Sequence, residues 1–341
     1  MTVAGVADEV EDVEWITVDH LSAAGTVRRQ ATSLARRLGF DDERTAGIAI
    51  VATELATNQV KHAGSGSVLL RVRRGGDVAA LELVAVDRGP GIADIEYALT
   101  DGNSTTGTLG IGMGAFVRLA SAWDLYSRPG LGTVVTVTFA NDPGRSAPAA
   151  TAAGLTRPMA GQEVCGDAYA LRVDDGVVSA MLADGLGHGP LAATASQEAV
   201  RAFRAAPGGT PTTLLTAVHR ALHGTRGAAV AVAQVADATV RYAGIGNISG
   251  TVLDDHGSRG MISHPGIAGA QARTIRENTY PIGPGGLVVM YSDGLTARQD
   301  LAPYVGLRAK SPLTVATVLM RDFGVRQDDA STLVVSAAAS R

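Results

Sequence analysis

The N-terminal part of the chain contains a helical run suited to phosphate chemistry. Glu54, Asn58 and Lys61 are spaced by four and three residues, which places them on one stripe of an α-helix. A carboxylate, an amide and a cation aligned in this way can activate a hydroxyl or a water, hold Mg²⁺ through oxygen and meet a phosphate. The same spacing is typical of a solvated helix face, so the neighbouring segments must distinguish the two interpretations.

Two glycine-rich segments follow that helical run. Asp87 ends a strand-like run and precedes a turn with two glycines, where an acidic side chain can accept the exocyclic amine of a base at close approach. Further along, a loop with four glycines leads into the helical run AFVRLAS, an arrangement suited to phosphates. The glycines are Gly89 and Gly91 in the turn, and Gly107, Gly110, Gly112 and Gly114 in the loop.

The C-terminal part places aspartates at the ends or starts of apolar, strand-like runs. An Asp-Gly pair at a strand end leaves the carboxylate projecting and the next carbonyl unobstructed, which supplies the oxygen ligands that divalent cations prefer. Two such ions about 3.5–4 Å apart polarise a phosphoryl group and activate water. A single Asp-Gly pair is more typical of a hairpin turn. The residues in this pattern are Asp167, Asp184 with Gly185, Asp293, and the pair Asp328 and Asp329.

The elements that must position these residues differ between the two parts. In the first part, two helical runs are followed by strands, and this alternation predicts an α/β fold. In the second part, tandem strands and two helices predict an α+β fold with a large antiparallel component. The runs are 24–39, 42–62, 68–73, 81–87 and 132–139, and then 169–173, 177–183, 191–205, 211–223, 228–234, 239–244, 287–291 and 331–335.

A composition break separates the two parts. Across residues 141–154 (NDPGRSAPAATAAG), Pro, Gly, Ser and Ala replace charged and large apolar residues, which is typical of a linker. With 341 residues and 46% hydrophobic content, the chain has room for two cores. We expect one domain over residues 1–140, a linker over 141–154 and a second domain over 155–341.

The three N-terminal segments, in this order, resemble the GHKL ATP-binding family, whose fold is the Bergerat α/β sandwich, over residues 15–140. The resemblance implies bound ATP with Mg²⁺, Glu54 as the base, Asn58 as the Mg²⁺ ligand and Asp87 as the adenine-reading residue. From their residue types, we also expect nucleotide contacts from Lys61 and from the glycines of the turn and the loop. The last three of these, Gly110, Gly112 and Gly114, would form the phosphate lid.

More narrowly, the runs DGNSTTGTLGIGMG, VRLAS and GTVVTVTF look like RsbT-type switch kinases, which phosphorylate a serine or threonine on STAS-domain proteins. The RsbW anti-sigma type is the close competitor, distinguished only by this glycine loop. A third interpretation is a non-catalytic, ATP-dependent binding module, in which case only the second domain turns over substrate. The intact set of aspartates argues against both domains being scaffolds.

The order D, DGxGHG, SDG and DD resembles the metal-dependent PPM or SpoIIE-type phosphatases, and longer runs such as ADGLGHGPLAATAS look like the RsbX type. The resemblance covers residues 155–340 and implies a PPM-type β-sandwich flanked by helices, with two Mg²⁺ or Mn²⁺ ions. Asp184 would bridge both ions. Asp167 and the Gly185 carbonyl would complete one site, and Asp293 with Asp328 the other.

Four positions in this second part leave questions open. Ala170 stands where many SpoIIE-type domains carry a second acidic residue, which weakens the first metal site. The arginine that anchors phosphate in eukaryotic relatives has no evident counterpart. His188 is either an acid near the phosphate or a structural residue between two glycines, and Asp329 is ambiguous in the same way. The single cysteine, Cys165, reads as a small packing residue.

Composition bounds the partners and the compartment. A net charge of −4 offers no long-range attraction for nucleic acid or anionic lipid. One cysteine excludes an internal disulfide and suits a reducing compartment, while the acidic N-terminus and the lack of a long apolar run predict a cytoplasmic protein. Taken with these bounds, the two resemblances imply a bacterial stress-signalling switch protein, with a serine/threonine phosphatase and a kinase module acting on STAS-domain regulators.

Overall fold

The computed structural model describes residues 9–75, 78–99, 113–142, 151–174, 176–270, 272 and 274–337. The chain divides into two units, Glu9–Ala149 and Ala150–Arg341, and each is described by itself. Among the helices of these described residues, none is both long and apolar enough to cross a membrane.

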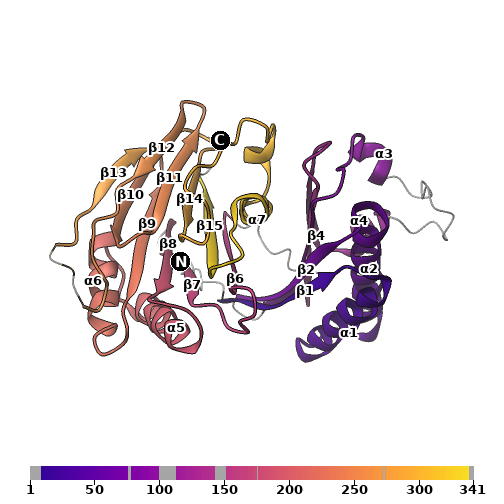
Figure 1. The fold of residues 1–341 in the computed structure, drawn as a ribbon, viewed down its shortest axis with the longest axis horizontal. Helices are drawn as coiled ribbons and strands as arrows, with labels where there is room; N and C mark the ends of the chain where they lie inside the picture. Colours follow the sequence, from indigo (N-terminus) through magenta and orange to yellow (C-terminus); the bar gives the residue numbers. More distant parts are fainter. Residues whose placement is uncertain are drawn as a thin grey trace. The chain divides into compact units, whose positions relative to one another are not determined.

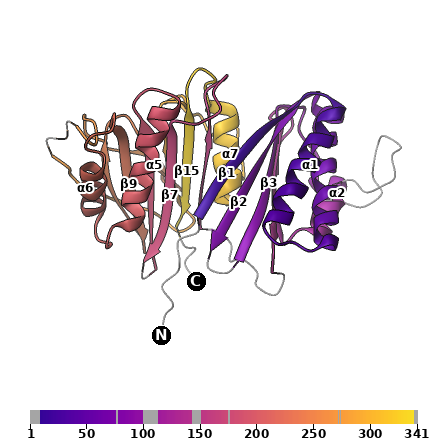
Figure 2. The same ribbon diagram turned by 90° about the horizontal axis from the view of Figure 1, so that it is seen from below.

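The N-terminal unit is a five-stranded sheet with α1 and α2 on one face (Figures 1 and 2). The strand order is β1-β2-β3-β5-β4, and every neighbouring pair is antiparallel. Its elements are β1 (Glu9–Val18), α1 (Leu21–Arg37), α2 (Asp42–Asn58), the π-helix η1 (Gln59–Ala63), β2 (Gly66–Gly75), β3 (Val78–Asp87), α3 (Ile95–Leu99), α4 (Gly114–Leu119), β4 (Ala122–Ser127) and β5 (Thr133–Ala140).

The core of this unit lies between the sheet and the two long helices. Val27 of α1 and Ile48 of α2 pack with Leu70 of β2 and Leu83 of β3, and all four are fully buried. α2 begins where Asp41 accepts a hydrogen bond from the Arg44 amide at 2.7 Å, which satisfies one of the unpaired N–H groups of the first turn. The helix that carries the predicted nucleotide residues is therefore fixed at its start and along its length.

The C-terminal unit is a sandwich of two five-stranded antiparallel sheets, ordered β13-β10-β9-β8-β7 and β12-β11-β14-β15-β6. Its elements are β6 (Ala152–Arg157), β7 (Asp167–Asp174), β8 (Val177–Gly185), α5 (Pro190–Ala205), α6 (Pro211–Ala221), β9 (Ala228–Ala236), β10 (Thr239–Ile245), β11 (Ser249–Asp254), β12 (Gly257–Met261), β13 (Asn278–Pro281), β14 (Leu287–Tyr291), the 3₁₀-helix η2 (Leu307–Ala309), α7 (Pro312–Phe323) and β15 (Ala330–Ser336).

The two sheets pack face to face, and helices cover their outer faces (Figure 1). Leu182 of the first sheet packs in one cluster with Val288 of the second. On the outer face of the first sheet, Val230 packs with Phe203 of α5 and Leu215 of α6. α7 packs against β15 and β6 of the second sheet. The predicted architecture, an N-terminal unit of helices on a sheet followed by a helix-flanked β-sandwich, is confirmed.

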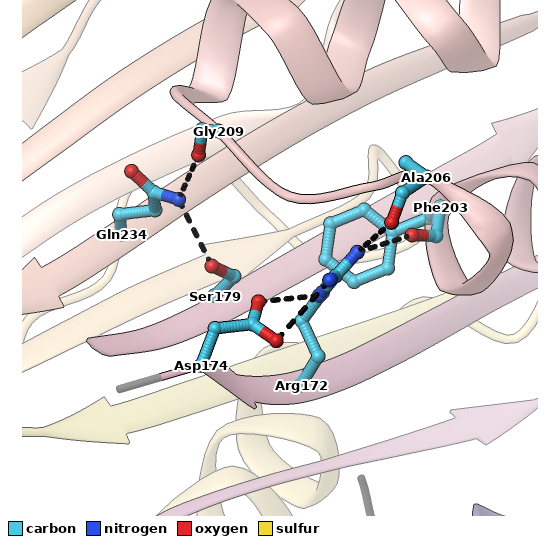
Figure 3. Close-up of polar contacts among 7 residues, drawn as sticks. All are labelled: Arg172, Asp174, Ser179, Phe203, Ala206, Gly209 and Gln234. Atoms are coloured by element: carbon cyan, nitrogen blue, oxygen red, sulfur yellow. Dashed lines mark hydrogen bonds and ion pairs between the residues drawn. The ribbon is translucent and has the colours of Figure 1, made fainter. Parts of the chain in front are cut away.

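A polar contact fixes the C-terminal end of α5 on the first sheet (Figure 3). Nη1 of Arg172 on β7 donates to the carbonyl oxygens of Phe203 at 3.0 Å and Ala206 at 2.8 Å, and its Nε donates to Asp174 at 2.6 Å. The last carbonyls of a helix have no partner within the helix, so Arg172 caps α5. In the same view, Gln234 of β9 donates to the Gly209 carbonyl at 2.7 Å and so holds the segment between α5 and α6.

Several elements were not predicted. β6 begins at Ala152, inside the segment expected to be a linker, because residues 152–157 pair with β15 despite their small side chains. β1 is acidic, yet it pairs with β2, where Asp12 lies 3.3 Å from the buried Arg71 guanidinium. β11, β12, β13 and α7 also lie in segments without a predicted element.

Candidate functional sites

The three residues of the predicted nucleotide stripe lie on α2 and the π-helix that follows it. Glu54 is half-buried on α2, Asn58 is the last residue of α2, and Lys61 is exposed on η1. The predicted helix over 42–62 therefore extends to Ala63, but it is π-helical rather than α-helical from Gln59 onward. A π-helix closes wider turns, so each residue advances less around the axis. Lys61 consequently does not keep the position relative to Asn58 that α-helical spacing implies.

Gln59 explains why the helix changes at this point, and sequence reasoning missed it. Its side chain is buried, and Nε2 donates to the carbonyl oxygens of Ser67 at 2.9 Å and Val86 at 3.1 Å. These bonds tie the helix end to β2 and β3, one residue before Asp87. Gly66 makes room for this contact, because a Cβ there would lie 2.5 Å from the amide carbon of Gln59.

The turn after β3 packs directly against the end of this helix. Oδ1 of Asp87 accepts hydrogen bonds from the amides of Gly89 at 2.8 Å and Thr133 at 3.2 Å. A Cβ on Gly89 would lie 2.5 Å from the Cβ of Ala63. Gly91 has φ +73°, and a Cβ there would lie 2.0 Å from the Arg128 carbonyl oxygen. Both glycines are thus required by close approach, which brings the turn to the helix that carries Asn58.

Two further residues that the sequence did not reveal hold this turn. Ser127 at the end of β4 accepts a hydrogen bond from the Ile92 amide at 2.8 Å and donates to the Gly132 carbonyl at 2.9 Å. Gly132 was predicted as the first strand residue, but it precedes β5 with φ +70°, and a Cβ there would lie 2.2 Å from the Asp87 carbonyl oxygen. A cavity of about 340 Å³ adjoins the turn and is lined by Ile92 and Ser127 among others, but by none of those predicted nucleotide residues that the structure describes.

Part of the predicted glycine loop cannot be placed. Gly107, Gly110 and Gly112 lie outside the described residues. Gly114 is described, is buried, and begins α4. The phosphate-lid role of these glycines stays a prediction.

The aspartates of the C-terminal unit come together from both sheets of the sandwich. Asp167 begins β7 and stands directly opposite Asp184 of β8 in the antiparallel register. Ser331 of β15, in the other sheet, donates a hydrogen bond to Oδ2 of Asp167 at 2.8 Å. Asp328 precedes β15 in the chain and Asp293 follows β14, the strand paired with β15.

The ionised carboxylates of this cluster are destabilised by burial and by one another, so a nearby positive charge would stabilise them. Burial, reinforced by the charges of Asp329 and Asp293, raises the pKa of Asp167 to about 7. Burial and the charge of Asp167 raise the pKa of Asp184 to about 9. Burial and the charge of Asp293 also raise the pKa of Asp328. Mutually repelling carboxylates of this kind are stabilised by a bound cation.

The donor set fits a divalent metal. Oδ1 of Asp167 is buried without a hydrogen-bond partner, which leaves an oxygen available to a cation. Among the described residues, no three His, Cys, Asp or Glu side chains already stand together as a ready-made metal cluster. Ala170, where related domains carry an acid, is buried in the core beneath α5 and offers no ligand. The individual ligand roles of Asp167, Asp184, Gly185, Asp293 and Asp328 therefore stay a proposal.

The glycines of the Asp-Gly pairs are required by packing rather than by hairpin turns. A Cβ on Gly185 would lie 2.2 Å from the Ala192 carbonyl oxygen of α5. A Cβ on Gly294 would lie 1.9 Å from the Asp329 carbonyl oxygen. Neither glycine has the positive φ of the favoured hairpin turns. These contacts hold the segments after Asp184 and Asp293 against their neighbours.

Asp329 fastens the backbone around the cluster. Its Oδ1 accepts the Met159 amide at 2.8 Å, and its Oδ2 accepts the Gly166 amide at 2.9 Å. Asp329 is therefore a positioning residue for the segment that leads into Asp167. Cys165 in the same segment has a thiol whose pKa is raised by burial, in keeping with a packing role.

Two further polar residues, Asn247 and His188, lie near the aspartates of this unit. Nδ2 of Asn247, between β10 and β11, donates to Oδ2 of Asp293 at 2.6 Å. The only signal for it in the sequence was an Asn after a Gly at a strand end. His188 is exposed, and its charge acts to lower the pKa of Asp328, which places it near that carboxylate.

The N-terminal unit has known relatives. Residues 18–139 match the family model described as histidine kinase-like ATPase domain. The chain is also 35% identical over 108 residues to the serine/threonine-protein kinase RsbT of Bacillus subtilis (strain 168), covering 32% of this chain and 81% of RsbT. The chain belongs to the RsbT family. The predicted GHKL-type, RsbT-like module is confirmed.

The RsbT-family unit is joined to a second known type. Residues 174–337 match the model for stage II sporulation protein E (SpoIIE). A solved chain described as "The bacterial stressosome: a modular system that has been adapted to control secondary messenger signaling" is 28% identical with a TM-score of 0.50, covering 54% of this chain and 97% of that one. Another, "Crystal structure of RsbX in complex with magnesium in space group P1", is 19% identical with a TM-score of 0.47, covering 54% and 94%.

The chain therefore combines a kinase-like ATPase domain of the RsbT family with a SpoIIE-type phosphatase domain, and it is related to stressosome regulators. In the RsbT-family unit, the structure brings the Asp87 turn to the end of the Asn58 helix. In the SpoIIE-type unit, it sets Asp167 opposite Asp184 and places Asp293 after β14 and Asp328 before β15, two neighbouring strands of the other sheet.

Proposed function

We propose that the C-terminal unit hydrolyses phosphoserine and phosphothreonine in proteins with the help of bound Mg²⁺ or Mn²⁺. The observation that carries this proposal is the convergence of aspartates from both sheets, with Asp167 paired across strands with Asp184 and bonded from β15. Asp184 would contact both ions, Asp167 and the Gly185 carbonyl one of them, and Asp293 with Asp328 the other.

In the reaction, the oxygen of a water forms a bond to phosphorus while the bond from phosphorus to the seryl or threonyl oxygen breaks. One proton of that water ends on the released hydroxyl, and inorganic phosphate keeps the other. Bound divalent ions polarise the phosphoryl group and lower the pKa of a coordinated water. The chain contributes fixed carboxylates, with Asn247 orienting Asp293 and Asp329 fixing the backbone before Asp167.

For the N-terminal unit, we propose ATP-dependent phosphorylation of a serine or threonine. Glu54 would act as the base, Asn58 would hold Mg²⁺, and Asp87 would read the adenine, with Lys61 and the glycines contacting the nucleotide. Membership of the RsbT family and the packing of the Asp87 turn on the helix end support this assignment. The alternative, a non-catalytic or RsbW-type binding module, would bind ATP or a partner without transferring phosphate.

We also propose STAS-domain proteins in the cytoplasm as the shared substrates of both units. Relationship to RsbT and likeness to a solved stressosome chain support this partner class. A short linker would raise the local concentration of each unit near one complex, because short flexible linkers give effective concentrations in the millimolar range. We propose one domain over residues 1–140 and a second domain that was expected over 155–341 and that includes β6 from Ala152.

The deciding experiment is phosphate release from a phosphorylated STAS-domain protein with and without Mn²⁺. We expect metal-dependent release by the wild type and a loss of at least about 100-fold in Asp184→Asn and Asp293→Asn, since the ions supply several kcal/mol of transition-state stabilisation. Asp237→Asn, in the turn between β9 and β10, is the matched control and should behave as the wild type. Release that is equal with and without metal would contradict the two-ion mechanism.

A further inference from the structure

One guanidinium lies against the loop that follows Asp184. Arg226 stands between α6 and β9, and a Cβ built on Gly187 would lie 3.3 Å from its Nη1. Gly187 has φ +88°, so its bare backbone leaves room for the arginine. The carbonyl oxygen of Gly187 lies 3.6 Å from the position a Cβ on Gly166 would take, next to Asp167. Arg226 thus lies against the loop that begins three residues after Asp184, although it is distant from every aspartate motif in the sequence.

The segment that carries Arg226 is fixed relative to this loop. Thr225 Oγ1 donates to the Leu222 carbonyl at 2.7 Å and accepts the Gly227 amide at 3.0 Å. The Gly227 carbonyl accepts the Leu186 amide at 3.1 Å, which joins the segment to the loop. Gly227 is itself confined, because a Cβ there would lie 2.5 Å from Cγ2 of Ile267. The backbone therefore presents Arg226 from a rigid platform.

The guanidinium of Arg226 has no polar partner among the residues that the structure describes. Its side chain is exposed, and across the described residues the structure records neither an ion pair nor a hydrogen bond for it. By contrast, Arg172, Arg241 and Arg259 of the same unit each pair with a carboxylate. A guanidinium held against the loop that follows a proposed metal ligand, yet not paired with a carboxylate, is available to an anion.

We propose that Arg226 binds the phosphoryl group of the substrate. This inference rests on the proposed phosphatase function and supplies the phosphate anchor that the sequence did not reveal. A planar guanidinium donates two parallel hydrogen bonds to two phosphoryl oxygens, a geometry that a lysine does not reproduce. Arg226 keeps its protons throughout the hydrolysis and orients the phosphorus toward the ions. Because it recognises the phosphoryl group itself, its effect extends to small phosphate esters.

The test compares the wild type with Arg226→Ala, Arg226→Lys and a control, Arg220→Ala, whose exposed side chain lies on α6. KM and kcat are measured with p-nitrophenyl phosphate and Mn²⁺, and binding of inorganic phosphate and of Mn²⁺ is measured by calorimetry. We expect Arg226→Ala to raise KM and weaken phosphate binding about tenfold or more, as for a lost charge-assisted hydrogen bond, with Mn²⁺ binding unchanged. Arg226→Lys should be intermediate, and Arg220→Ala should stay within about twofold.

Two outcomes would overturn the inference while leaving the phosphatase intact. One is an active wild type whose KM and phosphate affinity are unchanged by Arg226→Ala. The other is a loss of Mn²⁺ affinity as large as the loss of phosphate affinity, since Arg226 would then act through the metal site. An inactive wild type with Mn²⁺ bound would instead contradict the proposed function, and phosphate binding in the two proteins would still test Arg226.

Discussion

The two candidate sites are built in opposite ways. The phosphatase site rests on strand ends, where the antiparallel register sets Asp167 opposite Asp184 and a serine of the second sheet bonds across to it. The nucleotide site rests on a helix end and on turns, joined through the side chains of Gln59 and Ser127. Register fixes side chains in pairs, whereas a helix end depends on single polar contacts. We therefore expect the two units to respond differently to single substitutions.

The largest expected effect distinguishes the proposed phosphate transfer by the N-terminal unit from the proposed phosphatase activity of the C-terminal unit. Glu54→Ala removes the proposed base, so transfer of the γ-phosphate from ATP to a STAS-domain protein should fall about 10²–10⁴-fold. Phosphatase activity should not change, because the residue lies in the other unit. Transfer of labelled phosphate, with ATP affinity measured in parallel, checks this prediction.

Glu43→Ala, in the first turn of the same helix, is the matched control. Equal transfer by Glu54→Ala and the wild type would refute the role of Glu54. Tight ATP and partner binding by a wild type that transfers no phosphate would favour the binding-module alternative.

The next effect concerns the stability of the C-terminal unit. Asp329→Ala leaves the amides of Met159 and Gly166 without their acceptor, and hydrogen bonds to charged groups contribute about 1.5–3 kcal/mol each. We expect the free energy of unfolding of this unit to fall by about 3 kcal/mol. Both tryptophans, Trp15 and Trp123, lie in the N-terminal unit, so their fluorescence reports that unit alone.

Urea unfolding followed by circular dichroism and by tryptophan fluorescence therefore distinguishes the two units. Asp329→Ala should shift only the unfolding transition of the C-terminal unit, which is followed by circular dichroism and does not change the tryptophan fluorescence. Asp300→Ala, which removes one bond to the exposed Ala302 amide, is the control and should shift neither transition measurably. A shift of the fluorescence transition by Asp329→Ala would show that the two units do not unfold separately.

The side chain of Gln59 should stabilise the N-terminal unit as Asp329 stabilises the C-terminal unit. Gln59→Ala leaves the Ser67 and Val86 carbonyls without their donor, at about 1–3 kcal/mol in unfolding free energy. The fluorescence transition should move to lower urea, and ATP affinity should weaken because the helix end loses its attachment beside Asp87. Gln30→Ala, an exposed glutamine on α1, is the control. Unchanged ATP affinity would show that this attachment does not shape the nucleotide site.

The smallest effect should come from Asn247→Ala. It removes one hydrogen bond to a proposed metal ligand, Asp293, while the ligand itself remains. A bond to a carboxylate contributes about 1.5–3 kcal/mol. Because Asp293 itself remains to bind the metal, we expect about 1 kcal/mol of this to appear in Mn²⁺ binding, a fall of about fivefold in affinity. Calorimetric titration with Mn²⁺ measures it. A loss as large as that of Asp293→Asn would mean that Asn247 contacts the metal directly.

The parts of the fold that the sequence predicts are those with strong local patterns. The β-branched runs of β5 and β14 were located to within a residue because such side chains favour strands. β6 escaped prediction because AAGLTR has small residues that become a strand only by pairing with β15. Likewise, the change from α-helix to π-helix at Gln59 escaped prediction because it accompanies a buried contact of Gln59 with β2 and β3, which are distant in the sequence.

The same distinction applies to the sites. The aspartates were found because each stands in a short motif whose chemistry is evident from its neighbours. Ser331 bonds to Asp167 across 164 positions, and Asn247 to Asp293 across 46, so neither role leaves a local trace. Arg226 was missed for the same reason, since only the fold brings it to Gly187.

The bond from Ser331 to Asp167 also sets an order of assembly during protein synthesis. The N-terminal unit has its last strand, β5, before β7 is made, whereas the phosphatase cluster waits for β15, 164 positions after Asp167. At about 5–20 residues per second, that interval is on the order of ten to thirty seconds. On the ribosome, all strands of the RsbT-family unit have therefore been synthesised while the C-terminal unit still lacks β15. Every new molecule passes through a period in which only one of its two domains can be assembled.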